Sequence, residues 1–149
     1  MKKILIAQDI YRTIQQGDNF LERADVMVFT AATNDETLEI HRREHLHLII
    51  TELDMPGMGS EQFCSLIRRD PKLRSVSMLM ICPSSIAAIE KSLRCGVDGL
   101  LIRPVDPALL LAKTEQLLAV DWRGGKPRGS SDGGSYGVGP IQLSEMPLQ

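Results

Sequence analysis

Two acidic residues at the end of one apolar segment are the first candidates for chemistry in this chain. The segment Leu46–Leu53 carries Glu52 at its end, and Asp54 follows it directly. The next five residues, Met-Pro-Gly-Met-Gly, predict a loop because proline and glycine are dense there. A short apolar segment rich in β-branched residues is typical of a strand buried on both faces of a parallel sheet. Open α/β sheets build their sites at this carboxyl edge.

Other polar side chains follow further apolar segments in the same way. Asp9, preceded by Gln8, follows the first segment, and Cys82 and Arg103 each end a later one. If these segments are parallel strands of one sheet, Asp9, Glu52 and Arg103 converge above its carboxyl edge with Cys82 beside them. A cluster of acids that faces one cation suits a hard metal ion such as Mg²⁺, or an anion switch, better than it suits hydrolysis.

Several common site chemistries are excluded by motifs that the sequence lacks. The turn over residues 8–12 holds no glycine, so it neither accommodates a dinucleotide pyrophosphate nor forms a P-loop. No serine stands in a Gly-x-Ser-x-Gly motif. A zinc site is suggested by the spacing of His41, His45 and His47. No fourth ligand stands nearby, so we interpret these residues as a solvated helix end.

The elements that must position these residues alternate along the chain. We expect strands over Lys3–Ala7, Val26–Ala31, Leu46–Leu53, Val76–Cys82 and Gly99–Arg103. We expect helices over Tyr11–Arg23, Asn34–Glu44, Ser60–Arg69, Ser84 or Ser85 to Arg94, and Pro107–Val120. Asn34, Ser60 and Asp106 are the predicted N-caps. This alternation predicts a parallel α/β sheet covered by helices on both faces.

Length and composition bound the remaining possibilities. The chain has 149 residues, which suits one domain, placed at 1–121, while the Gly-, Ser- and Pro-rich residues 122–149 are typical of a flexible tail or linker. A net charge of -2 argues against direct binding of nucleic acid or a membrane surface. Cys64, Cys82 and Cys95 lack metal-binding or CxxC spacing, which favours buried thiols in a reducing cytoplasm.

Three motifs on these strands resemble one known family. They are a strand that ends in Gln8-Asp9, the pattern acid-x-x-x-Pro-Gly over Glu52–Gly57, and the basic-Pro pair Arg103-Pro104. From Lys2 to about Val120 the chain is similar to the receiver domain of bacterial two-component response regulators. The resemblance implies a CheY-like, flavodoxin-type fold, a doubly wound five-stranded parallel sheet of order 2-1-3-4-5 with five helices.

The resemblance also implies roles for the residues at the carboxyl edge. In that family an aspartate four residues before the proline accepts a phosphoryl group from a histidine kinase, and an acidic pair at the first strand binds Mg²⁺. A Thr or Ser ends the fourth strand and contacts the phosphoryl group, and a lysine ends the fifth. The backbone carbonyl at the position of Asp54 completes the metal site.

This sequence departs from that pattern around the whole pocket. Gln8 replaces one acid, and Glu52 stands in place of the acceptor aspartate. Its extra methylene moves the carboxylate outward by roughly 1.5 Å, which matters because in-line transfer depends on close positioning. Cys82 replaces the hydroxyl residue with a weak donor, and Pro83 has no N–H to offer the phosphoryl oxygens.

The basic residue and the switch position also differ. Arg103 replaces the lysine, and Leu100 occupies the place where a switching aromatic often sits. Glu52 and Arg103 could then form a bidentate charge-assisted pair that fills the space of an aspartyl phosphate and its lysine. Two interpretations of Glu52 stay open, a mimic of the phosphorylated acid or a simple loss of phosphorylation.

These departures lead to a prediction with stated alternatives. We expect a degenerate, phosphorylation-independent receiver domain that is not an enzyme, acts in the cytoplasm and signals through a protein partner or an output domain. One alternative is a conventional Mg²⁺-dependent phosphoacceptor, and a second is a flavodoxin-like flavin-binding protein. Weak Mg²⁺ binding through Asp9, Glu52 and the Asp54 carbonyl stays open, as does a histidine kinase partner. Residues expected on a candidate homodimer face of the fourth helix, fifth strand and fifth helix are Lys91, Arg94, Asp98, Asp106, Lys113 and Glu115.

Overall fold

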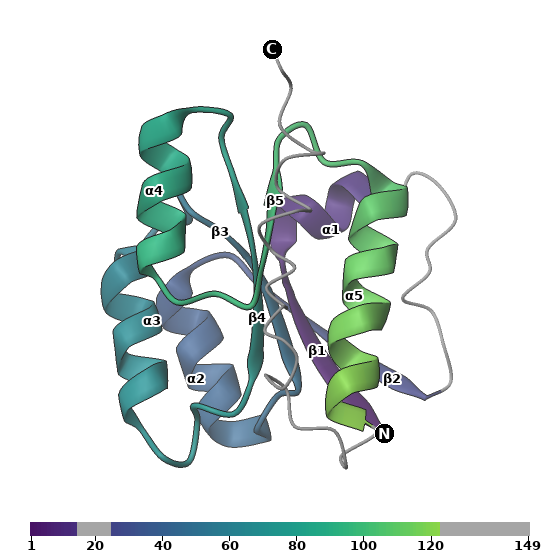
Figure 1. Cartoon of the computed structure of the whole chain (residues 1–149). Helices are drawn as coiled ribbons and strands as arrows, with labels where there is room; N and C mark the ends of the chain where they lie inside the picture. The colour runs from purple at the N-terminus through teal and green to yellow at the C-terminus, as the bar shows by residue number, and fades with distance from the viewer. Residues whose placement is uncertain (15–24, 123–149) are drawn as a thin grey trace.

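The computed structural model describes residues 1–14 and 25–122, which form one parallel sheet between two layers of helices (Figure 1). The strands are β1 (Lys2–Ala7), β2 (Val26–Ala31), β3 (Leu48–Glu52), β4 (Ser77–Cys82) and β5 (Gly99–Ile102). The helices are α1 (Gln8–Ile14), α2 (Asn34–Glu44), α3 (Ser60–Arg69), α4 (Ile86–Arg94) and α5 (Pro107–Trp122). All neighbouring strands are parallel, in the order β2-β1-β3-β4-β5, which confirms the predicted fold.

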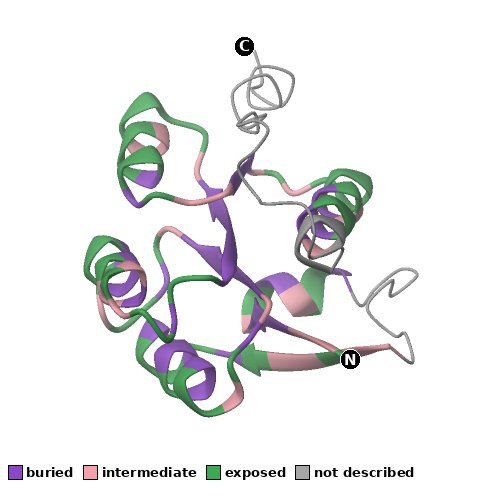
Figure 2. Cartoon of the chain, turned by 60° about the horizontal axis from the view of Figure 1, so that its bottom comes forward, coloured by how far each residue is buried: buried purple, intermediate pink, exposed green. Residues whose placement is uncertain are grey.

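The core lies on both faces of the three central strands. Helices α2, α3 and α4 cover one face of the sheet, and α1 and α5 cover the other (Figure 2). Every residue of β3 and of β4 is buried, because each strand is flanked by neighbours and covered on both sides. Ile50 pairs with Ile6 of β1 and with Leu79 of β4. This register brings the carboxyl ends of β1, β3, β4 and β5 to one edge of the sheet.

Two of the predicted helix caps are wrong by one residue. Thr33, not Asn34, is the N-cap of α2, and its hydroxyl accepts the Glu36 N–H at 3.0 Å. Gly59, not Ser60, is the N-cap of α3, and the Ser60 hydroxyl instead donates to the Leu53 carbonyl at 2.6 Å. In both cases the polar side chain after the cap is used for a contact with the loop after β3.

The third predicted cap is confirmed, since Asp106 accepts the N–H of Ala108 at the start of α5. Ser85, at which the sequence allowed α4 to start, caps that helix by accepting the N–H of Ala88. Both side chains satisfy a backbone N–H that has no partner within its own helix.

Several predicted boundaries differ from the observed ones. Helix α1 begins at Gln8, directly after β1, and the predicted part of this helix beyond Ile14 lies outside the described residues. Strand β3 begins at Leu48, and β4 begins at Ser77. Strand β5 ends at Ile102, so Arg103 follows the strand, and the Arg103-Pro104 peptide bond is cis. Helix α5 runs two residues past the predicted end at Val120. Of the predicted tail, 122–149, Trp122 belongs to α5, and the rest lies outside the described residues.

His41 is buried rather than solvated, which corrects the interpretation of the histidine cluster. Its side chain is 2% exposed, Nδ1 accepts the Leu46 N–H at 3.0 Å, and Nε2 lies 3.0 Å from the Leu73 carbonyl, to which it donates. Burial lowers the pKa of His41 below its usual value. His47 accepts the Lys3 N–H on Nδ1. These bonds make the cluster part of the framework, and among the described residues no group of three or more His, Cys, Asp or Glu side chains is placed to hold a metal ion.

Candidate functional site

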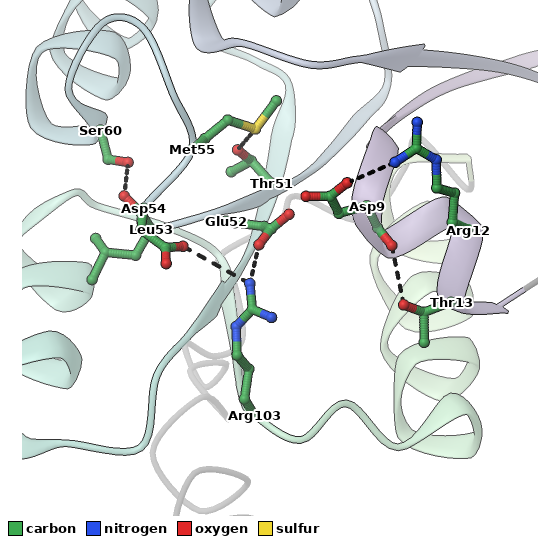
Figure 3. Close-up of polar contacts among 10 residues, drawn as sticks. All are labelled: Asp9, Arg12, Thr13, Thr51, Glu52, Leu53, Asp54, Met55, Ser60 and Arg103. Carbon is green, nitrogen blue, oxygen red and sulfur yellow. Dashed lines mark hydrogen bonds and ion pairs between the residues drawn. The ribbon is translucent and has the colours of Figure 1, made fainter.

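An open cleft of about 430 Å³ lies at the carboxyl edge of the sheet, where the sequence predicts a site. It is formed by the loop after β3, the start of α1, the loop after β4 and the residue after β5 (Figure 3). The residues that line it are Asp9, Glu52, Asp54, Met55, Pro56, Pro83 and Arg103. The structure thus brings together predicted side chains from three strand ends.

The ion pair between Glu52 and Arg103 is the central contact of the cleft. Arg103 Nη2 contacts Glu52 Oε1, and the same nitrogen lies 3.8 Å from Asp54 Oδ1 (Figure 3). The Glu52 side chain is 11% exposed, whereas the Arg103 side chain is 39% exposed. The predicted two-nitrogen fork is therefore wrong in detail, because one guanidinium nitrogen serves two carboxylates.

Burial and charge act in opposite directions on Glu52. Burial raises the pKa of the Glu52 carboxyl above its ordinary value, and the Arg103 guanidinium opposes that rise. The negative charges of Asp54 and Asp9 raise this pKa further. The surroundings of the Glu52 carboxylate thus disfavour its negative charge, and the positive charge of Arg103 offsets part of this effect.

Asp9 lies at the rim of the cleft rather than at its centre. It belongs to the first turn of α1, and its carboxylate pairs with Arg12 at 3.3 Å, where both side chains are mostly exposed. Gln8, the other member of the predicted acidic-pair remnant, lines an adjoining cavity of about 180 Å³ between β1, β2 and the loop after β3. Asp9 and Glu52 border both cavities.

Cys82 and Pro83 end β4 at the predicted place but contribute differently. The Cys82 side chain is fully buried and is not among the residues that line the cleft. Burial raises the pKa of the Cys82 thiol, while Ser92 of α4 and the Arg103 charge lower it to a smaller extent. Pro83 does line the cleft, and it presents no N–H there. At the switch position, Leu100 is fully buried.

Sequence reasoning missed the residues that support the loop after β3. Thr51 Oγ1 lies 3.5 Å from Met55 Sδ, and Asn34 donates from Nδ2 to the Met58 carbonyl at 2.8 Å. Asp35 accepts the Met58 N–H at 2.8 Å. The sequence did contain one indication of these contacts. Asn34 and Asp35 supply more polar groups at a helix start than one N-cap requires, so one of them was free to bond elsewhere.

Comparison with known proteins identifies the family. The family model described as "Response regulator receiver domain" matches residues 4–115, which is most of the chain. This chain belongs to the response regulator receiver domain family. Receiver domains are signalling modules that interact with other proteins, and the fold class is the CheY-like one. Within the described residues, no helix has the length and apolar character to cross a membrane.

Three similar proteins illustrate the range of the family. The Streptomyces coelicolor transcriptional regulatory protein AfsQ1 is 29% identical over 126 residues, covering 85% of this chain and 53% of its own length. The structure of the chemotaxis response regulator CheY4 of Vibrio cholerae is 25% identical with a TM-score of 0.65, covering 79% of this chain and 99% of that chain. The receiver domain of Saccharomyces cerevisiae Ssk1, crystallised with the histidine phosphotransfer protein Ypd1, has a TM-score of 0.67 at 22% identity, covering 80% of this chain and 90% of that chain. This chain spans about half the length of curated relatives such as AfsQ1.

Proposed function

We propose that this chain is a degenerate receiver domain that signals through protein contacts without accepting a phosphoryl group. The observation that carries the proposal is the ion pair between Arg103 and the buried Glu52, at the position of the family's acceptor carboxylate. Arg103 contacts one oxygen of this carboxylate, so an incoming phosphoryl donor would have to displace the guanidinium. The pair places permanent charges where other receivers form a transient aspartyl phosphate.

Two further features of the cleft support this proposal. Pro83 lines the wall from which a backbone N–H would have to hold a phosphoryl oxygen, and it has none. Cys82, at the place of the hydroxyl residue, is fully buried and is a weak donor. Electrostatic stabilisation of a transferred group needs donors aimed at its oxygens, and these two positions supply none.

The acids present fit Mg²⁺ poorly. Their oxygens are of the hard kind that Mg²⁺ prefers. However, Asp9 is paired with Arg12, and one Arg103 nitrogen lies against Glu52 and near Asp54. A bound cation would have to displace these guanidinium groups. We therefore propose that Mg²⁺ binds weakly, in competition with Arg103, and takes no part in the output.

The surface proposed for partners, or for a second copy of the chain, exposes both charged and apolar side chains. Among the residues expected on the face of α4, β5 and α5, Lys113 is 5% exposed and Asp98 is bonded to Arg68. Arg94 pairs with Glu61 of α3. Three apolar side chains of α4 and α5 are exposed as well: Ile86, Leu93 and Leu109. We propose that they contact a protein partner together with the exposed charges of the same helices.

Incubation with acetyl phosphate and Mg²⁺, followed by intact mass measurement, tests the proposal. We expect no phosphorylated protein from the natural chain and only poor modification of Glu52→Asp, because Pro83 and Arg103 are still present. The double variant Glu52→Asp with Arg103→Lys is the matched comparison, and we expect it to be modified more than either single variant. Stoichiometric modification of the natural chain would overturn the proposal and favour a conventional phosphoacceptor.

A further inference from the structure

The loop after β3, residues 53–59, is bonded to the start of α2 by two adjacent side chains. Asn34 Nδ2 donates to the Met58 carbonyl at 2.8 Å, and the Asn34 N–H donates to the Pro56 carbonyl at 3.2 Å. Asp35 Oδ1 accepts the Met58 N–H at 2.8 Å. Both backbone groups of Met58 are thus held by α2. The bonded residues are 23 and 24 positions apart in the sequence, so the bonds fix the loop against α2, which is a separate element.

Gly57 shows how closely the loop fits against this helix. Its φ of +90° lies in the region that favours glycine. A Cβ atom at Gly57 would lie 2.3 Å from Asp35 Oδ1 and 3.2 Å from Thr33 Cβ. The backbone of the loop therefore approaches α2 at a distance that only glycine permits.

The same contacts reach the residue before Glu52. Asn34 is completely buried, and its Oδ1 accepts from Thr51 Oγ1 at 3.5 Å. The Thr51 hydroxyl also contacts Met55 Sδ, and Met55 and Pro56 form part of the wall of the cleft. A continuous set of contacts thus runs from the start of α2 through the loop to the surroundings of Glu52.

We propose that Asn34 and Asp35 are positioning residues of this site, which hold the loop after β3 in one conformation and thereby set how Glu52 is enclosed. The inference deepens the proposed function and rests on it, because a site that uses neither a phosphoryl group nor a metal must be ordered by the protein itself. The two residues act through the loop and do not touch Arg103.

The contacts of Asp35 and Glu52 allow this role to be separated from a direct one. Asp35 Oδ1 bonds to the Met58 N–H, whereas Glu52 pairs with Arg103. We therefore expect any effect of Asp35 on Glu52 to pass through the position of the loop. Asp35 is exposed, so its replacement leaves the core intact.

The experiment follows the titration of the Glu52 carboxyl carbon by NMR in full-length Asp35→Ala, Asp35→Asn and Glu39→Ala. In Asp35→Ala the loop loses its acceptor and admits water, so we expect the Glu52 midpoint to shift down toward the value of about 4.3 of a free glutamate. Asp35→Asn removes the same charge but keeps an oxygen acceptor, so we expect the natural midpoint. Glu39→Ala removes an exposed acid of the same helix and is expected to change nothing.

Two results separate a positioning role of Asp35 from a purely structural role in stabilising the fold. A lower melting temperature of Asp35→Ala with an unchanged Glu52 midpoint would overturn the proposal, and so would equal shifts in Asp35→Ala and Asp35→Asn. If Asp35→Ala does not fold, Gly57→Ala serves instead, since its Cβ must push the loop away from Asp35 and lower the same midpoint. Acetyl phosphate reactivity of the natural chain remains a separate measurement, so failure of the proposed function is recognised independently.

Discussion

Removing the guanidinium of Arg103 tests the energetic argument for the site most directly. In Arg103→Ala the Glu52 carboxylate, on a side chain that is 11% exposed, loses its partner, while Asp54 and Asp9 still repel its negative charge. Breaking a fully buried ion pair costs about 3–5 kcal/mol, whereas an exposed pair contributes about 0–1 kcal/mol. Because the Arg103 side chain is 39% exposed, we expect an intermediate loss of about 1–2 kcal/mol of unfolding free energy at pH 7.

The pH dependence of this loss identifies its cause. Glu52 has a pKa raised by burial in the folded protein, so the folded state binds its proton more readily than the unfolded state does. Such a group stabilises the fold below its unfolded pKa of about 4.3, and this stability is lost as the pH rises through the folded pKa. Without Arg103 the pKa rises further. The loss in Arg103→Ala should therefore be small at pH 4 and grow toward pH 7.

Urea unfolding of four proteins measures this effect: the natural chain, Arg103→Ala, Glu52→Gln and the double variant. We expect Arg103→Ala to lose much less unfolding free energy in the Glu52→Gln background, because no buried charge is then left unpaired. The unfolding free energy of Glu52→Gln should increase relative to that of the natural chain as the pH rises from 4 to 7. A loss in Arg103→Ala that is the same at both pH values, or the same in the Glu52→Gln background, would refute the reasoning.

Two further predictions concern the framework of the sheet. Burial lowers the pKa of His41, so the unfolded chain binds its proton more readily, and the stability of the natural chain should fall as the pH drops below about 6.5. Midpoints of urea unfolding between pH 7.5 and 5.5 check this, and a His41→Gln variant with an equally steep fall would contradict it. Arg68 donates to the Val76 carbonyl at 2.8 Å and to Asp98 at 2.9 Å, so Arg68→Met should lose about 1–3 kcal/mol of unfolding free energy. Arg69→Met, one residue along on an exposed position, is the control, and an equal loss in both variants would show that the Arg68 bonds are unimportant.

Helix starts show where prediction from sequence reached its limit. Thr33 and Asn34 are both good N-caps, and propensity alone does not choose between them. Thr33 is the cap because the loop after β3 takes the Asn34 side chain, through the Met58 carbonyl 24 residues away. Similarly, His41 near a helix end resembles a solvated residue until the Leu73 carbonyl is placed beside it.

The sequence by itself determined the order of the elements and which side chains stand at the carboxyl edge of the sheet. Apolar segments of strand length, separated by helical patterns, leave few other ways to bury them. It also indicated that Glu52 and Arg103 pair, whereas only the tertiary structure decided the partner of Asp9 and the approach of Arg103 to Asp54. Helix α1 begins directly at Gln8, and Asp9 pairs with Arg12 on that helix rather than with a group at the centre of the cleft. Arg103 lies close enough to serve both Glu52 and Asp54, because a long side chain at a strand end is placed by its neighbours and not by its own position in the chain.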